Sequence, residues 1–306
     1  MDKRRVLITG SNGLLGQKLV NLLRKRESIQ LIATSRGPNR NPYKNGCEYH
    51  AFDVSNPESV AEYMYRLRPT DVIHTAAMTH VDDCEKDPSA CQLQNVDAVR
   101  LLVQACEEYN ARFIHVSTDF IFDGLDGPYR EDHDANPLSV YGQAKLDSEL
   151  IVEQAKIPWA IVRTVLLYGV IPDSSRSNIV LWVKKSLEAG QNIRVVQDQV
   201  RSPTLAEDLA DGIAAVLLRN KTGVFHISGA ETMNIYQLAC RVAAFWKLDA
   251  SLIEAIDSQT LNQPATRPPK TGFLILKAQT ELNYKPHTLE QGLDLVDKQL
   301  KALQQV

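Results

Sequence analysis

The sequence lacks the residue patterns of proteins that depend on disulfides or on bound metal ions. Its five cysteines are scattered, odd in number and without a C-x-x-C pair, which argues against a disulfide framework or a zinc knuckle. The seven histidines include no H-x-x-x-H pair, so we expect no metal site. Free thiols are typical of a reducing compartment, and the expected location is the cytoplasm.

Long apolar runs and a large net charge are also missing. No stretch approaches the roughly 20 apolar residues that span a bilayer. The 34 basic and 37 acidic side chains leave a formal charge of −3, so neither a nucleic acid nor a membrane is expected as a partner. The start, MDKRRVLITG, has basic residues but no apolar region or cleavage site of a signal peptide. A 306-residue chain with 44% hydrophobic residues suits one large globular domain or two moderate ones.

What the sequence does contain is a regular alternation of short apolar segments and longer amphipathic ones. Strands are predicted at residues 5–10, 29–35, 47–55, 71–77, 111–119 and 159–169. Helices are predicted at 14–26, 57–69 and 88–108, and one more carries Tyr141. Near-continuous apolar strands that alternate with helices favour an α/β fold with a Rossmann-type, doubly wound parallel sheet.

After residue 168 the pattern becomes less regular. Helices are predicted at 179–191 and 205–220, strands at 193–204 and 223–229, and the segment 263–273 is rich in proline and basic residues. We therefore predict a cofactor-binding core at residues 1–168 that also carries the catalytic residues. Residues 169–306 are expected to form a small, mainly substrate-binding α/β region, with some elements returning to the core sheet.

A glycine-rich turn joins the first predicted strand to the first helix in VLITGSNGLLGQKL. Its spacing is G-x-x-G-x-x-G, with Gly10, Gly13 and Gly16 separated by residues that include Asn12 and Leu14. Glycines permit a tight turn and let backbone N–H groups approach a pyrophosphate, while the helix N-terminus adds partial positive charge. The turn predicts a dinucleotide site, although a glycine turn without a ligand is the alternative.

The end of the second predicted strand indicates which dinucleotide is bound. An acidic residue usually holds the ribose 2′-hydroxyl of NAD(H) at this place. The sequence here is ATSRGPNR, with Ser35 and Arg36 and no carboxylate. A cation and hydroxyls suit a 2′-phosphate, so NADP(H) is expected over NAD(H), with NAD(H) kept as an alternative. Arg36 could instead be an ordinary solvated loop residue.

The stretch PLSVYGQAKLDSE contains a tyrosine and a lysine four residues apart, Tyr141 and Lys145. Residues at this spacing lie on one face of a helix. A nearby lysine favours the tyrosinate and is expected to lower the pKa of the phenol, which would make Tyr141 a general acid. Taken alone, the pair could equally be a polar stripe on a surface helix.

Several motifs together resemble the extended short-chain dehydrogenase/reductase superfamily and, within it, the dTDP-4-dehydrorhamnose reductase family. They are TGSNGLLG, FDVSN, HTAAMTHVDDCE, STDFIFDG, PYREDHDANPLSVYGQAK and RTVLLYG. The resemblance is close over residues 4–170 and is weaker in DQVRSPTLAEDLA. It implies that Tyr141 donates a proton to the sugar carbonyl and that Lys145 lowers the tyrosine pKa and binds the nicotinamide ribose. It also implies that Thr118 is the third catalytic residue and that Asp119 lies near the substrate.

The resemblance assigns further residues to the cofactor site. Asp53 and Val54 match positions beside the adenine, although Asp53 could instead cap the helix that begins near residue 57. Ala76 and Ala77 end the fourth strand, where small side chains let the cofactor approach, or they could be plain sheet packing. Asn95 matches an asparagine that supports the catalytic lysine.

The sequence departs from the rhamnose-type pattern at two places. Leu166 replaces a tryptophan that would face the sugar, and Val200 and Arg201 replace a Phe-Gly pair. Candidates for the nucleotide or sugar pocket are Asn178, Gln199, Arg201 and Arg267, because a guanidinium suits a diphosphate.

The function that the resemblance implies is NADPH-dependent reduction of a nucleotide-linked 4-keto-6-deoxysugar. The substrate would be dTDP-4-dehydrorhamnose, reduced to dTDP-L-rhamnose for cell-surface polysaccharide precursors, by a chain that could form a homodimer. One alternative is an NAD-dependent nucleotide-sugar epimerase or dehydratase of the same superfamily, although no glutamate follows Asp119. Another is a non-catalytic regulatory subunit that keeps the nucleotide fold and binds a partner enzyme.

Overall fold

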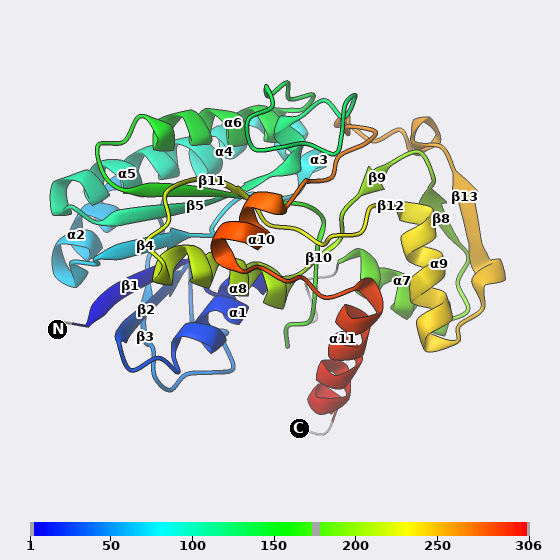
Figure 1. Ribbon diagram of the computed structural model, residues 1–306, viewed down its shortest axis with the longest axis horizontal. Helices are drawn as coiled ribbons and strands as arrows, with labels where there is room; N and C mark the ends of the chain where they lie inside the picture. The colour runs from blue at the N-terminus through cyan, green and yellow to red at the C-terminus, as the bar shows by residue number, and fades with distance from the viewer. Residues whose placement is uncertain (1–2, 173–177, 305–306) are drawn as a thin grey trace.

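The structure is a computed structural model that describes residues 3–172 and 178–304. Within these residues a seven-stranded parallel sheet has the order β11-β6-β5-β4-β1-β2-β3. This confirms the expected doubly wound α/β fold (Figure 1). Its strands are β1 (Arg4–Thr9), β2 (Ile29–Ser35), β3 (Glu48–Ala51), β4 (Asp71–His74), β5 (Arg112–Thr118), β6 (Trp159–Thr164) and β11 (Gly223–His226).

Helices cover both faces of this sheet, and the strand pattern shows why. Val6 and Ile8 of β1 point into one hydrophobic cluster with α1 and α8, whereas Leu7 between them points into a second cluster with α2 and α5. Both faces are therefore apolar, as expected of a parallel sheet buried on both sides. The helices packed around the core sheet are α1 (Leu14–Leu23), α2 (Pro57–Leu67), α3 (Val81–Lys86), α4 (Pro88–Gln92), α5 (Ala98–Tyr109), α6 (Val140–Glu153), α8 (Ala206–Leu218) and α10 (Leu276–Leu282).

Elements from the second half of the chain belong to this core. Strand β11 pairs with β6, α8 packs against α1, and α10 packs against α8 and β11. The remaining elements form a smaller region beside the carboxyl ends of the strands, with its own hydrophobic cluster. They are β7 (Leu167–Tyr168), α7 (Ile179–Glu188), β8 (Ile193–Val196), β9 (Val200–Arg201), β10 (Thr204–Leu205), β12 (Met233–Asn234), α9 (Ile235–Trp246), β13 (Ile253–Ile256) and α11 (Leu289–Gln304).

Three predicted elements differ from the observed ones. The single helix predicted at 88–108 is divided into α4 and α5 by a π-helical turn, Leu93–Asp97. The strand predicted at 159–169 is interrupted at Leu166, whose φ is +38°. The strand predicted at 193–204 is divided into β8, β9 and β10, which pair with different partners. In the two strand segments the local apolar pattern is present, but pairing with different partner strands decides where each strand ends.

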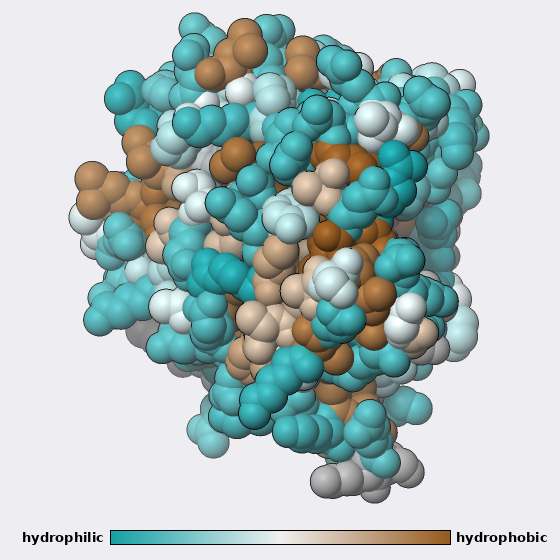
Figure 2. All heavy atoms as spheres, turned by 90° about the vertical axis from the view of Figure 1, so that its right-hand side faces the viewer, coloured by the Kyte–Doolittle hydropathy of each residue, from teal (hydrophilic) through white to brown (hydrophobic). Residues whose placement is uncertain are grey.

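The surface of the smaller region is mainly hydrophilic. Figure 2 looks onto this end of the molecule and shows hydrophobic residues among a larger number of hydrophilic ones. Among residues 3–172 and 178–304, none of the helices is both long enough and apolar enough to cross a membrane.

Candidate active site

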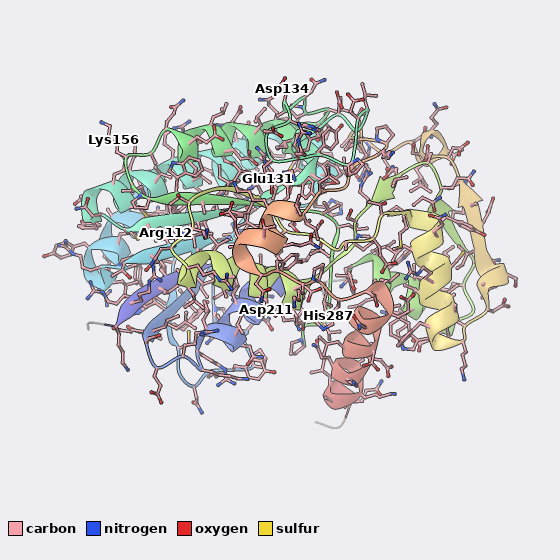
Figure 3. All side chains as sticks on the ribbon, in the orientation of Figure 1. Arg112, Glu131, Asp134, Lys156, Asp211 and His287 are labelled. Atoms are coloured by element: carbon pink, nitrogen blue, oxygen red, sulfur yellow. The ribbon has the colours of Figure 1, made fainter. Side chains whose placement is uncertain are left out.

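A cavity of about 720 Å³ opens at the carboxyl ends of the core strands, where doubly wound sheets bind ligands. Arg112, labelled in Figure 3, marks the amino end of β5, and the cavity lies beyond Thr118 at the other end of that strand. It brings together every residue that the sequence analysis assigned to catalysis, cofactor or substrate. These are Gly10, Asn12, Gly13, Leu14, Gly16, Ser35, Arg36, Asp53, Val54, Ala76, Ala77, Thr118, Asp119, Tyr141, Lys145, Asn178, Gln199, Arg201 and Arg267.

The glycine turn forms one wall of the cavity and leaves no room for side chains. Gly10 has φ +68°, and a Cβ there would lie 2.7 Å from the backbone nitrogen of Ala76. A Cβ on Gly16 would lie 2.3 Å from the carbonyl oxygen of Gly10. Helix α1 begins at Leu14 after Gly13, which has no side chain to cap it. The first turn of α1 therefore offers backbone donors and partial positive charge at the cavity wall, as a pyrophosphate requires.

The loop after β2 is organised by Asn12 of the glycine turn. The backbone N–H of Asn12 donates to Ser35 Oγ at 3.0 Å, and the side-chain oxygen of Asn12 accepts from the backbone N–H of Arg40 at 2.9 Å. Arg36 and Arg40 are both exposed at the cavity wall, and Arg36 reaches Gln94 at 3.4 Å. The sequence analysis identified Arg36 but missed Arg40, the second cation on this loop.

Asp53 does not cap the following helix. Its carboxylate accepts from the backbone N–H of Ser55 at 2.9 Å and from the Ser55 hydroxyl at 2.7 Å. The N-cap of α2 is Asn56, whose side chain accepts from the Ser59 N–H at 2.7 Å. The capping interpretation of Asp53 is therefore wrong, because Asn56 is the residue that caps α2. Asp53 instead fixes a turn at the cavity wall.

Tyr141 and Lys145 lie on the same face of α6 and both border the cavity. Ser139 caps this helix by accepting from the Gly142 N–H at 3.2 Å. Tyr141 is 8% exposed and packs edge-on against Phe120, with ring centroids 5.9 Å apart. The pair is therefore not a solvated surface stripe. It is held in the wall of a pocket, as an acid–base pair would need to be.

The lysine is held by the core strand β5. The Lys145 Nζ donates to the carbonyl of Val116 at 2.8 Å and lies 3.1 Å from His115 Nε2. Asn95, which the resemblance assigned to support Lys145, instead bonds both backbone polar groups of Met78, at 2.8 and 2.9 Å. Asn95 therefore makes no direct hydrogen bond to Lys145 among the described residues, and the side chain that contacts the amine is His115.

Burial dominates the pKa values of the pair. It raises the pKa of Tyr141, an effect that Thr118 opposes through a hydrogen bond to the phenol and Asp119 reinforces through its charge. Burial lowers the pKa of Lys145 to about 8, although the negative charge of Glu149 acts to raise it. The net effect on Tyr141 is opposite to the lowering expected from the sequence, because desolvation of the phenol outweighs the hydrogen bond from Thr118 that lowers the pKa. Tyr141 is therefore protonated at neutral pH, the form that a proton donor needs.

The buried carboxylate of Asp119 has both hydrogen-bond and ion-pair partners. It accepts from Thr118 at 3.2 Å and from the Thr271 hydroxyl, and the Arg201 guanidinium lies 3.8 Å away. Burial raises the pKa of Asp119, and the charge of Arg201 opposes that shift. Thr271 was not identified from the sequence, since only the folded chain brings residues 119 and 271 together.

The guanidinium of Arg201 donates its hydrogen bonds to acceptors within the protein. Its side chain is 4% exposed and donates to the carbonyls of Val200 at 2.8 Å and Pro268 at 2.7 Å. A guanidinium with these partners has little capacity left for a diphosphate. We therefore revise the expectation that Arg201 binds substrate directly. Its observed contacts join β9 to the 268–269 segment and to Asp119.

Arg267 and Asn178 also have structural partners. Arg267, which lines the cavity, forms a two-point ion pair with Asp82 of α3, at 3.1 and 2.8 Å. Asn178 caps α7 by accepting from the Leu181 N–H at 3.2 Å, and it donates to the Gly169 carbonyl at 2.8 Å. Both still line the cavity, so each can meet a ligand from its present position.

Apolar side chains also line the cavity, including Leu166, Ile171 and Ile235. A separate, smaller cavity of about 190 Å³ lies beside α8, with Asp211 and His287 at its wall (Figure 3). No residue proposed for catalysis lines it. Across residues 3–172 and 178–304, no group of three or more His, Cys, Asp or Glu side chains could hold a metal ion.

Curated proteins of similar sequence include reductases and a subunit of a methionine adenosyltransferase. A probable low-salt glycan biosynthesis reductase of Haloferax volcanii is 31% identical, covering 94% of this chain and 95% of the relative. A dTDP-4-dehydrorhamnose reductase of Streptomyces griseus is 32% identical, over 86% and 83%. Methionine adenosyltransferase 2 subunit beta of Bos taurus is 30% identical, over 84% and 76%.

A solved structure shares both the fold and part of the sequence. The dTDP-4-dehydrorhamnose reductase of Bacillus anthracis, solved in complex with NADP, superposes with a TM-score of 0.83. It is 25% identical, and the match covers 97% of this chain and 99% of that one. The family model described as the RmlD substrate binding domain matches residues 4–302. The chain belongs to this family, which lies within the extended short-chain dehydrogenase/reductase superfamily.

Proposed function

We propose that the protein is an NADPH-dependent reductase of a nucleotide-linked 4-keto-6-deoxysugar, with dTDP-4-dehydrorhamnose as the first candidate substrate. In this proposal it makes dTDP-L-rhamnose for cell-surface polysaccharide precursors. The observation that carries the proposal is the shared cavity: the Thr118 hydroxyl, the Tyr141 phenol and the Lys145 amine border the same space as the glycine turn. The same activity is printed in the names of the Streptomyces and Bacillus relatives.

The residues of the chain would supply the proton and the positioning. Reduction of a ketone builds negative charge on its oxygen, which Tyr141 stabilises as a hydrogen-bond donor. Thr118 becomes a second donor once its hydroxyl turns from Asp119 to that oxygen. Tyr141, protonated at neutral pH, then gives its proton to that oxygen. The positive charge of Lys145 stabilises the tyrosinate that remains. When bound, the nicotinamide cofactor supplies the hydride.

The cofactor would be held by the glycine turn and the loop after β2. The close approach of Gly10 to the backbone of Ala76 and the start of α1 after Gly13 suit the pyrophosphate, and the small side chain of Ala76 borders the cavity beside them. Arg36 and Arg40 with Ser35 offer two cations and a hydroxyl where NAD-binding chains carry an acid. This favours a 2′-phosphate and hence NADPH, in agreement with the ligand of the Bacillus structure.

The sugar and its nucleotide would occupy the other half of the cavity. Leu166, Ile171 and Ile235 offer apolar surface that suits the methyl group of a 6-deoxysugar. Arg267 lines the cavity and is the candidate for the diphosphate, which would have to replace the Asp82 carboxylate that the planar fork now holds at two points.

A panel of nucleotide-linked 4-ketosugars, each mixed with the protein and NADPH, tests the proposal. The expected result is NADPH oxidation with dTDP-4-dehydrorhamnose and formation of a rhamnose product, identified by NMR. Oxidation with none of the ketosugars would refute the reductase assignment. Reaction with a different ketosugar would keep the reaction type and replace the substrate.

A regulatory role is the second candidate, because a methionine adenosyltransferase subunit is 30% identical. In that case the chain would bind a nucleotide and a partner enzyme without turning over a sugar. A stoichiometric complex with a methionine adenosyltransferase, together with inactivity in the ketosugar panel, would favour this role. Tightly bound NAD without net NADPH use would instead favour an epimerase or dehydratase.

A further inference from the structure

A row of polar side chains crosses the core sheet beneath the cavity. Thr9 of β1 pairs in register with His74 of β4, and His74 pairs with His115 of β5. We call these three residues the polar ladder. Each is at most 1% exposed, and the two imidazole rings stack 5.6 Å apart at 13°. Buried polar groups are costly unless they are hydrogen-bonded, so such a row in an apolar sheet needs an explanation.

The ladder ends at the proposed catalytic lysine. His115 Nε2 lies 3.1 Å from Lys145 Nζ and 2.9 Å from Ser148 Oγ. Ser148 Oγ is also 2.7 Å from the carbonyl oxygen of Lys145, one helical turn earlier. His115 Nε2 and the carbonyl of Val116 thus form a socket around the Lys145 amine, and Ser148 contacts His115 beside it.

The hydrogens of this socket can be assigned from donor and acceptor rules. A lysine ammonium only donates, so a charged Lys145 requires a lone pair on His115 Nε2. That nitrogen has a single lone pair, so the Ser148 hydroxyl donates instead to the Lys145 carbonyl. The proton of the neutral imidazole is then on His115 Nδ1, which is buried and has no hydrogen-bond partner within the described part of the chain.

The other end of the ladder is assigned in the same way. Thr9 Oγ1 accepts from the backbone N–H groups of Thr75 at 3.3 Å and Ala76 at 3.5 Å. Its own hydrogen therefore points to His74 Nδ1, 2.8 Å away. Burial and the charge of Lys145 lower the pKa values of both histidines, that of His74 to about 3. Both imidazoles are neutral, so His115 can act as an acceptor throughout the working pH range.

Other ionisable groups also face the lysine. The carboxylate of Glu149 favours the ammonium, but it is paired with Arg163 at 2.7 Å. His115 is the side chain that contacts the amine directly. The groups on the surrounding elements are Tyr141 and Glu149 on α6, His115 on β5, His74 on β4, Cys91 on α4, Arg163 on β6 and Asp119 after β5.

We propose that His115 is a positioning residue that holds the Lys145 ammonium at the cavity wall through the lone pair of Nε2. Withdrawing this acceptor leaves the buried ammonium with one fewer partner, so the charged form becomes less favourable. The role rests on the proposed function, because it concerns the lysine of that reaction. It does not require His115 to touch substrate or cofactor.

Two amide replacements of nearly equal polarity test the role. In His115→Gln the side-chain oxygen can reach the place of Nε2, whereas in the shorter His115→Asn it cannot. The loss of a hydrogen bond to a charged group should lower the pKa of Lys145 by about one to two pH units in His115→Asn. The pH at which kcat/KM falls on the alkaline side should decrease by the same amount. In His115→Gln both this pH and the Lys145 pKa should return most of the way to the wild-type values.

A control variant separates this effect from general damage to the core. His226 is another fully buried imidazole, stacked on Phe273 and bonded to the Tyr129 carbonyl, with no contact to Lys145. It lies 3.4 Å from Arg163 Nη1, but the contacts of Arg163 with Glu149 run through Nε and Nη2 and do not depend on it. His226→Asn should lower the melting temperature but leave the alkaline limb unchanged. Equal alkaline limbs in wild type, His115→Asn and His115→Gln would overturn the proposal.

A second readout does not depend on turnover. The ε-carbon of Lys145, labelled with carbon-13 and assigned by comparison with Lys145→Met, reports the pKa of the amine by NMR titration in the cofactor-free protein. If the pKa falls in His115→Asn and returns in His115→Gln, the positioning role holds even when no ketosugar reacts, and only the proposed reaction fails. If ketosugars react but this pKa is the same in both variants, the positioning role is refuted and the reaction stands.

Discussion

The buried ion pair between Glu149 and Arg163 provides a sharp prediction that joins stability to the candidate site. Their side chains are 1% and 7% exposed, and the guanidinium contacts the carboxylate at 2.7, 3.1 and 3.1 Å. Arg163 is fixed further by the carbonyl of Glu131 at 3.1 Å. Glu149→Gln keeps the shape of the side chain but removes its charge, which leaves the buried guanidinium uncompensated.

The size of the effect follows from this burial. Removing one partner of a buried pair typically costs about 3 to 5 kcal/mol. With roughly 2 cal/mol/K of unfolding entropy per residue, the 306-residue chain should lose about 5 to 8 °C in melting temperature. Because the charge of Glu149 also favours the Lys145 ammonium, the pKa of Lys145 should fall in the same variant.

The assay is differential scanning calorimetry of both proteins in the same buffer. The matched control is Glu62→Gln, which breaks an exposed ion pair with Arg66 in α2, where the two side chains are 59% and 53% exposed. Exposed pairs contribute little, so this control should shift the melting temperature by less than about 1 °C. If Glu149→Gln also melted within a degree or so of the wild type, the account of this buried pair would be wrong.

Three further predictions concern activity. Tyr141→Phe should lower kcat by about 10²- to 10⁴-fold while NADPH affinity, measured by fluorescence titration, stays near the wild-type value; near-normal turnover would exclude Tyr141 as the proton donor. The kcat/KM for the ketosugar should be high at neutral pH and fall above about pH 8, because the ammonium of Lys145 is lost as the pH rises through its pKa; a profile that is flat to pH 10 would contradict this. Arg36→Ala should raise the KM for NADPH roughly tenfold through loss of a charged hydrogen bond and leave that for NADH unchanged; equal effects in steady-state kinetics with both cofactors would remove the 2′-phosphate assignment.

The parts of the fold that follow from local pattern could be predicted from the sequence. The glycine spacing between an apolar strand and an amphipathic helix predicted the turn at Gly10, because only glycine fits where a Cβ would meet the backbone of Ala76. Parallel strands end at a common edge, so Ser35, Thr118 and the glycine turn were expected at one cavity, and all of them line it. The alternation of apolar and amphipathic segments also predicted the fold class, and the observed seven-stranded sheet confirms it.

Features that depend on contacts between distant elements could not be predicted in this way. A cation at Arg201 looks like a phosphate ligand in sequence, but the carbonyls that occupy it come from residues 200, 268 and 269. The socket of Lys145 depends on His115, which as sequence is only a polar residue in a buried strand. The upward shift in the pKa of Tyr141 depends on how completely the fold covers the phenol, which spacing alone does not show.

The central claim, that this chain reduces the C4 ketone of a nucleotide-linked sugar with NADPH, can be tested most directly with an isotope. The protein is incubated with dTDP-4-dehydrorhamnose and NADPH that carries deuterium at the transferable position, and the sugar is analysed by mass spectrometry and NMR. The account predicts a dTDP-rhamnose product with deuterium at C4, since the hydride comes from the cofactor. Recovery of the sugar without deuterium, whether unchanged or epimerised, would contradict it.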